Sequence, residues 1–185
     1  MPYILEALDI AAGSGLNIPL VYNTGGYDSV DTLKMLDGII DIYMPDMKYS
    51  DDRVAGDLSG VTDYVTINRA AVKEMHRQVG DLEMDGAGVA ERGLLVRHLV
   101  LPDGLAGTGE VVRFLTQDIS TDTYLNIMDQ YHPCYRAGDI PRMSRPVSAP
   151  EFAESVSMAR RQGLDRLDRY NSPALKITPS QKEKL

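Results

Sequence analysis

Short apolar runs that alternate with helix-like segments constrain the fold of this chain more than any other feature. Four apolar runs predict strands, at 17–22, 39–44, 94–101 and 123–128. Apolar residues at helical spacing predict helices at 3–12, 30–37, 62–79 and 107–119. Strands that alternate with helices favour a parallel sheet with right-handed crossovers. Because the strands are almost continuously apolar, we expect both faces of that sheet to be covered.

The predicted fold class is α/β, with either an open doubly wound sheet or an incomplete (β/α) barrel. Four strands are few for either architecture. The chain also opens on a helix with no strand before it, so the first strand would have an edge without a neighbour. We therefore expect the chain to be the later part of a longer domain. The segments 51–61 and 80–93 are expected to be a loop and a connector.

The composition changes after residue 136, where prolines punctuate a basic loop. Ser148 is predicted to cap a helix over 149–162, and the residues after it are predicted to be a frayed tail. The predicted organisation is therefore a partial barrel over 1–140, followed by a C-terminal helix and flexible tail over 141–185.

Charge and cysteine content exclude several classes of function. The chain has 19 Lys plus Arg against 27 Asp plus Glu, a net charge of −8, which argues against a nucleic-acid partner. Neither a membrane-spanning apolar run nor a signal-peptide pattern is present, so we expect no membrane association and a cytoplasmic location. A single cysteine, Cys134, excludes an internal disulfide and any all-cysteine zinc or iron–sulfur site built from this chain alone.

Polar residues follow or interrupt each predicted strand, and in parallel α/β folds the chemistry lies at the carboxyl ends of strands. Asp46 and Lys48 are two residues apart and share a face in an extended chain. They predict either a surface ion pair or a site for a zwitterionic ligand, and their spacing does not choose between these. Arg97 and His98 are adjacent, so at most one of them can enter a shared pocket. His132 and Cys134 are more simply explained as loop residues than as a catalyst or a nucleophile.

Four segments together resemble the later strands of radical S-adenosylmethionine (SAM) proteins of the pyruvate formate-lyase activating enzyme type, with most likeness to its uncharacterised iron–sulfur branch. The segments are LVYNTGG at 20–26, IYMPDMK at 42–48, VRHLVLPDG at 96–104 and MDQYHP at 128–133. The resemblance covers about residues 1–140. It implies a six-stranded partial (β/α) barrel. It also implies a [4Fe–4S] cluster that binds SAM and forms a 5′-deoxyadenosyl radical.

The resemblance also implies roles for individual positions. Asp46 and Lys48 match an acid and a lysine that hold the methionine end of SAM, the acid partly through a monovalent cation. Thr24 and the Met44 carbonyl match further positions of that cation site, where Asn23 stands in place of the aspartate common in the family. Arg97 matches an arginine near SAM, and His132 matches a histidine near the ligand.

The family's CxxxCxxC loop and Gly-Gly-Glu segment have no counterpart in this sequence. We therefore expect a SAM-binding portion that is truncated and inactive alone, with a protein glycine as a possible substrate and flavodoxin or ferredoxin as an electron donor. Two other functions remain open. One is a barrel-type lyase that forms a Schiff base on Lys48, with Asp46 as proton shuttle. The other is a non-catalytic interaction module that uses the basic stretch 136–145 and the terminal helix.

Overall fold

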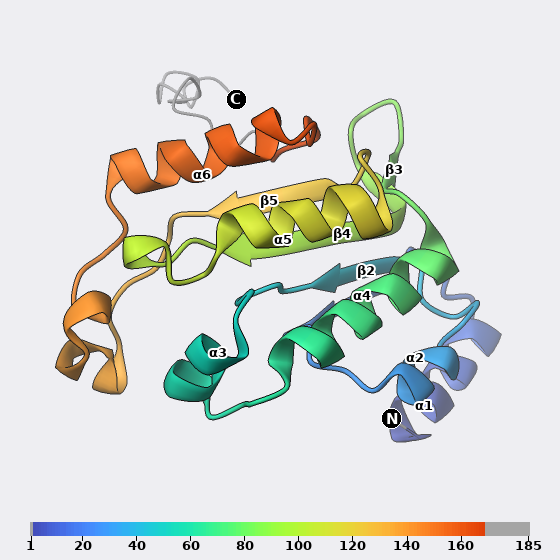
Figure 1. The fold of residues 1–185 in the computed structure, drawn as a ribbon. Helices are drawn as coiled ribbons and strands as arrows, with labels where there is room; N and C mark the ends of the chain where they lie inside the picture. The colour runs from blue at the N-terminus through green and yellow to red at the C-terminus, as the bar shows by residue number, and fades with distance from the viewer. Residues whose placement is uncertain (1, 169–185) are drawn as a thin grey trace, which may run out of the picture.

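The computed structural model describes residues 2–168, and its elements follow the predicted alternation with additions (Figure 1). The helices are α1 (Pro2–Gly13), α2 (Val30–Lys34), α3 (Asp52–Ser59), α4 (Tyr64–Val79), α5 (Thr108–Phe114) and α6 (Ala149–Arg161). The strands are β1 (Val21–Thr24), β2 (Ile42–Pro45), β3 (Glu83–Met84), β4 (Ala90–Leu99) and β5 (Tyr124–Met128). A π-helical turn over Leu115–Ile119 continues α5, and single 3₁₀ turns lie at Pro102–Gly104, Tyr135–Asp139 and Pro141–Met143.

The strands form one five-stranded sheet that confirms the α/β class. β1 pairs with β2, β2 with β4 and β4 with β5, all in parallel, while β3 pairs antiparallel with the start of β4. A parallel sheet of this size with helical crossovers is consistent with a partial barrel. None of the helices in the described part of the chain is both long and apolar enough to cross a membrane.

The first predicted strand is displaced and less buried than expected. β1 begins at Val21 and lies at an edge of the sheet, where Val21 is 51% exposed. The apolar residues before it, Leu16 and Ile18, are also exposed rather than part of a strand. Among the described residues β1 has a partner on one side only, as the topology argument predicted.

Two segments predicted as irregular contain regular structure. In 51–61, Asp51 caps α3 by accepting a hydrogen bond from the Arg53 N–H at 2.7 Å. Val54, Ala55 and Leu58 lie on one side of this helix, but the helix has only eight residues and contains Gly56, so the sequence looked like a loop. In 80–93, the Asp85 carboxylate accepts hydrogen bonds from two backbone N–H groups at 2.8 Å and builds the turn of the β3–β4 hairpin. Side-chain-built turns have no hydrophobic period to reveal them.

Burial alternates along the strands, because one face of the sheet packs against helices. Figure 1 shows α4 and α5 in front of the strands, with α6 above them. Their apolar faces enclose strand residues that are nearly inaccessible to solvent: Tyr43, Leu94, Val96, Leu125 and Ile127. The alternate residues are only half-buried and define what we call the open face: Met44, Leu95, Arg97, Tyr124 and Asn126. The expectation that both faces are covered is therefore wrong for the described residues.

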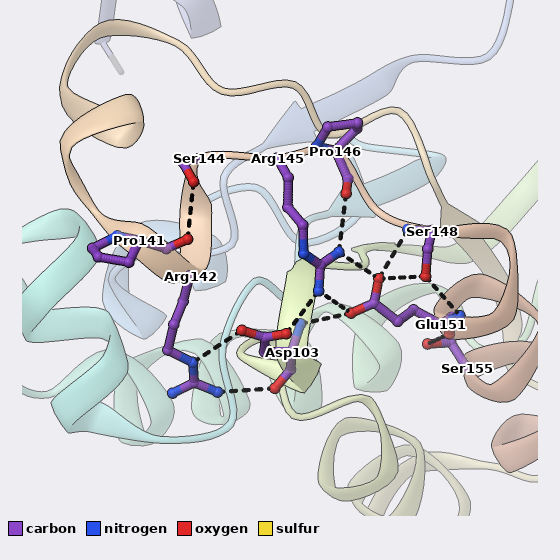
Figure 2. A network of polar contacts seen from close by, with 9 residues as sticks. All are labelled: Asp103, Pro141, Arg142, Ser144, Arg145, Pro146, Ser148, Glu151 and Ser155. Atoms are coloured by element: carbon purple, nitrogen blue, oxygen red, sulfur yellow. Dashed lines mark hydrogen bonds and ion pairs between the residues drawn. The ribbon is translucent and has the colours of Figure 1, made fainter.

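The C-terminal helix α6 packs against α5 and against the 3₁₀ turn that follows β4. The prediction of a capped helix is confirmed, because Ser148 and Glu151 form a capping box at the start of α6. Figure 2 shows Arg145 reaching both Asp103, which follows β4, and Glu151, at 2.7 and 2.8 Å. This network ties the proline-rich loop to the carboxyl end of β4. Most of the predicted tail, residues 169–185, lies outside the described residues.

Candidate functional site

A polar row crosses the open face at the carboxyl ends of the strands. Asp46, one residue beyond β2, bridges to Arg97 of β4, and Arg97 is in register with Asn126 of β5. Partners in a parallel register project their side chains to the same face. The Arg97 guanidinium donates to Oδ1 of Asp46 through Nε at 2.8 Å and through Nη2 at 2.6 Å.

Lys48 completes a cluster with both signs of charge. Its Nζ lies 3.3 Å from the second carboxylate oxygen of Asp46. The Lys48 side chain is 43% exposed, against 17% for Asp46 and 26% for Arg97. Gly25 lies beside the lysine amine, because a Cβ atom there would be in ordinary van der Waals contact with Nζ, 3.5 Å away. Asp46, Lys48 and Arg97, which we call the charged cluster, carry one net positive charge and are reachable from solvent.

His98 points to the other face of β4, as the alternation of a strand requires. It is fully buried, and its Nδ1–H donates to the Met47 carbonyl at 2.7 Å while its Nε2 accepts from the Thr108 hydroxyl at 2.9 Å. A carbonyl can only accept, so Nδ1 carries a hydrogen, and in the neutral form Nε2 is then the acceptor. Burial lowers the pKa of His98 and favours that neutral form. Arg97 therefore belongs to the charged cluster, whereas His98 binds the backbone between Asp46 and Lys48 from the helix-covered face.

The two residues predicted at the end of the first strand separate onto opposite faces. Asn23 is in register with Met44 and lies exposed on the open face, one row away from Asp46. Thr24 turns toward the helices, where its hydroxyl donates to Asp28 at 2.6 Å and accepts from the Gly26 N–H at 3.2 Å. The Thr24 hydroxyl is thus occupied locally and is not brought to the charged cluster.

His132 is a second predicted residue that makes no polar contact with the cluster among the described residues. It lies four residues past the end of β5 and is exposed. Within residues 2–168, no recorded hydrogen bond or ion pair joins it to Asp46, Lys48 or Arg97. Asn126 lies in the polar row beside Arg97, and the sequence analysis did not single it out. The sequence feature that could have indicated it is a single amide side chain within the apolar run of the last strand.

The residues present do not fit an iron–sulfur cluster. Such clusters are held by several thiolates, and this chain contains one cysteine, Cys134, which is exposed. The described residues also contain no group of three His, Cys, Asp or Glu side chains placed to hold a metal ion. The charged cluster, by contrast, has the donors and acceptors that an amino-acid group requires.

Comparisons with known proteins agree with this architecture. No protein-family model matches the sequence. An uncharacterized protein of Methanocaldococcus jannaschii, MJ0674, is 28% identical over 165 residues, which cover 89% of this chain and 44% of that protein. The crystal structure of a radical SAM methyltransferase from Sphaerobacter thermophilus matches with a TM-score of 0.52 and 15% identity, over 80% of this chain and 40% of that one.

This chain therefore spans less than half the length of each protein it matches. The structural likeness does not show the pyruvate formate-lyase activating type within the superfamily. It does show that most of the described chain shares the fold of part of that methyltransferase, which is consistent with a partial barrel of parallel strands.

Proposed function

We propose that this chain binds SAM through the charged cluster, as the SAM-binding part of a radical SAM enzyme. The observation that carries the proposal is one carboxylate paired with two cations on the open face, at the carboxyl ends of neighbouring strands. The amino-acid end of SAM carries a carboxylate and an ammonium. Lys48 and the remaining donors of Arg97 would hold the carboxylate, and Asp46 would attract the ammonium.

Radical chemistry on SAM needs an electron from an iron–sulfur cluster. These 185 residues contain one cysteine and so lack the thiolates that hold such a cluster. We propose that other polypeptide supplies the cluster ligands and that this chain is inactive alone. A protein glycine as substrate and flavodoxin or ferredoxin as electron donor stay predictions, as does the assignment to the activating type. A monovalent cation beside Asp46, at a site that includes Thr24 and the Met44 carbonyl and has Asn23 where the family often has aspartate, stays a prediction too.

The test is a SAM titration of the complete chain by calorimetry. Lys48→Met should weaken SAM binding at least tenfold, because it removes the exposed cation of the cluster. Lys73→Met is the matched control, because Lys73 is also half-exposed and ion-paired to an aspartate, Asp118, at 2.7 Å. The control should bind SAM within twofold of wild type. Equal loss in both variants, or no SAM binding by the wild-type chain, refutes the proposal.

The geometry favours neither of the other functions. A Schiff-base lysine is activated by desolvation or by a neighbouring cation, whereas Lys48 is half-exposed and faces a carboxylate. Borohydride trapping of a carbonyl substrate on Lys48 would reverse this conclusion. In the basic stretch, Arg142 and Arg145 already bind Asp103 within the chain and hold the loop (Figure 2), so they are not free contacts for a partner.

A further inference from the structure

The backbone that carries the charged cluster is held on several sides although it lies beyond the end of β2. The Asp46 N–H donates to the Thr24 carbonyl at 3.0 Å, and the Met47 N–H donates to the Arg97 carbonyl at 2.8 Å. The Met47 carbonyl accepts from His98 at 2.7 Å. Residues 46 and 47 therefore have fixed backbone directions without belonging to a strand.

Two side chains of α4 supply the remaining bonds. The hydroxyl of Tyr64 accepts a hydrogen bond from the Lys48 N–H at 2.8 Å and donates to the Asp46 carbonyl at 3.4 Å. Four residues later on the same face of the helix, the Asn68 amide donates to the Asp46 carbonyl and to the Gly26 carbonyl, both at 2.9 Å. One helix thus connects both ends of the segment 46–48 to the loop after β1.

The burial of these two side chains is unusual for polar groups that serve packing alone. Tyr64 is 4% exposed and Asn68 is 1% exposed. The Asn68 Oδ1 atom is buried and has no hydrogen-bond partner. A buried unpaired amide oxygen destabilises the fold. An asparagine at this position is therefore explained by what its amide N–H groups hold and not by its own stability.

The surroundings leave this junction little freedom. A Cβ atom at Gly26 would lie 2.1 Å from the Asp46 carbonyl oxygen and 2.4 Å from Asn68 Nδ2. The ring of Tyr64 stacks on Tyr27 with centroids 6.2 Å apart and meets Tyr49 edge-on at 5.3 Å. Burial raises the pKa of the Tyr64 phenol, which therefore keeps the proton that it donates to Asp46.

We infer that Tyr64 and Asn68 are positioning residues, which fix Asp46 and Lys48 relative to Arg97 so that the charged cluster meets the amino-acid end of SAM. This inference rests on the proposed function. Neither residue touches the ligand. Their effect comes through the backbone, because the directions of the Asp46 and Lys48 side chains follow from the hydrogen bonds of the segment that carries them.

The experiment compares two Tyr→Phe variants of the complete chain. Tyr64→Phe removes the hydroxyl and keeps the stacked ring. Tyr43→Phe is the matched control, because it removes a hydroxyl that is equally buried and donates to Gln78 Oε1 at 2.6 Å, away from the segment 46–48. Amide hydrogen exchange by NMR reports the Lys48 N–H relative to core amides, and calorimetry reports SAM affinity. A second variant, Asn68→Leu, is measured in the same way where it folds.

In Tyr64→Phe, protection of the Lys48 amide relative to core amides should fall at least tenfold, and SAM binding should weaken about fivefold. Tyr43→Phe should leave both within twofold of wild type, even where both variants unfold at lower urea concentrations. Unchanged protection of the Lys48 amide in Tyr64→Phe, or equal loss of SAM affinity in both tyrosine variants, overturns the inference. If the wild-type chain binds no SAM, the proposed function fails, and the Lys48 amide comparison alone decides the positioning role.

Discussion

Replacing His98 with leucine should change how the stability of the fold depends on pH. Burial lowers the pKa of His98 below its ordinary value of 6.5. The unfolded chain takes up a proton on this residue as the pH falls through about 6.5, whereas the native protein does so only at lower pH. The stability that the neutral histidine contributes is therefore present above pH 6.5 and is lost as the pH decreases.

The magnitude follows from one proton bound by the unfolded state and not by the native state. If native His98 stays neutral over this range, the wild-type free energy of unfolding should fall by at most about 1.4 kcal/mol between pH 7.5 and 5.5 from this residue. His98→Leu should also destabilise the protein by about 2–4 kcal/mol at pH 7.5. That loss has a separate cause, because the substitution leaves the Met47 carbonyl and the Thr108 hydroxyl buried without their partner.

Urea unfolding followed by circular dichroism, at pH 7.5, 6.5 and 5.5, measures both effects. The difference in unfolding free energy between wild type and His98→Leu should shrink from the highest to the lowest pH, by at most about 1.4 kcal/mol. The other two histidines, His76 and His132, are present in both proteins and cancel in this difference. A difference that stays constant with pH would refute the assignment of His98 as a buried neutral imidazole.

Three other predictions use different parts of the chain. Gly26→Ala should destabilise the fold by more than about 2 kcal/mol in urea unfolding, because the φ of Gly26 is +76° and a Cβ atom there would meet the Asp46 carbonyl. Gly38→Ala is the control, because Gly38 has a similar φ of +79° but open space around it, and it should cost about 1 kcal/mol. Equal costs would contradict the steric argument. Arg145 lowers the pKa of Glu151 through their hydrogen bonds, so the stability that the ionised Glu151 contributes is present above pH 4.5 and is lost as the pH falls below it. In Arg145→Met, the free energy of unfolding should therefore fall less steeply with decreasing pH in an acid titration. Anaerobic treatment with iron and sulfide should leave the chain without a [4Fe–4S] cluster. Four irons per chain in the iron assay would contradict the proposal that other polypeptide supplies the cluster ligands.

Long periodic segments were the predictable part of this fold. The apolar spacing in 62–79 predicted α4 almost to the residue, and the apolar run before Met128 predicted β5. In both segments the spacing of apolar residues follows from burial against a single core, so it can be read from the sequence alone. The β3–β4 hairpin and α3 were missed because side-chain caps and turns define them. Burial of the first strand was overestimated because an apolar run does not say which strand lies at an edge.

The candidate site was predictable where strand geometry alone decides. Asp46 and Arg97 both lie at the carboxyl ends of strands, and the register between β2 and β4 brings them together. Thr24 shows the opposite case, because one residue of alternation turns its hydroxyl to the helix side. Tyr64 and Asn68 depend on how α4 packs across the sheet ends, a long-range relation that no local pattern contains.

Neighbouring residues of β4 contact the charged-cluster segment from opposite faces of the sheet. Arg97 binds the Asp46 side chain on the open face, while His98 binds the Met47 backbone from the covered face. A leucine at position 68 would remove the unpaired oxygen of Asn68, whereas a leucine at position 98 would leave the Met47 carbonyl and the Thr108 hydroxyl unpaired. His98 and Asn68 are both buried, and both donate to the backbone beside the charged cluster. Both residues therefore hold the backbone that carries Asp46 and Lys48, and His98 stabilises the fold as well.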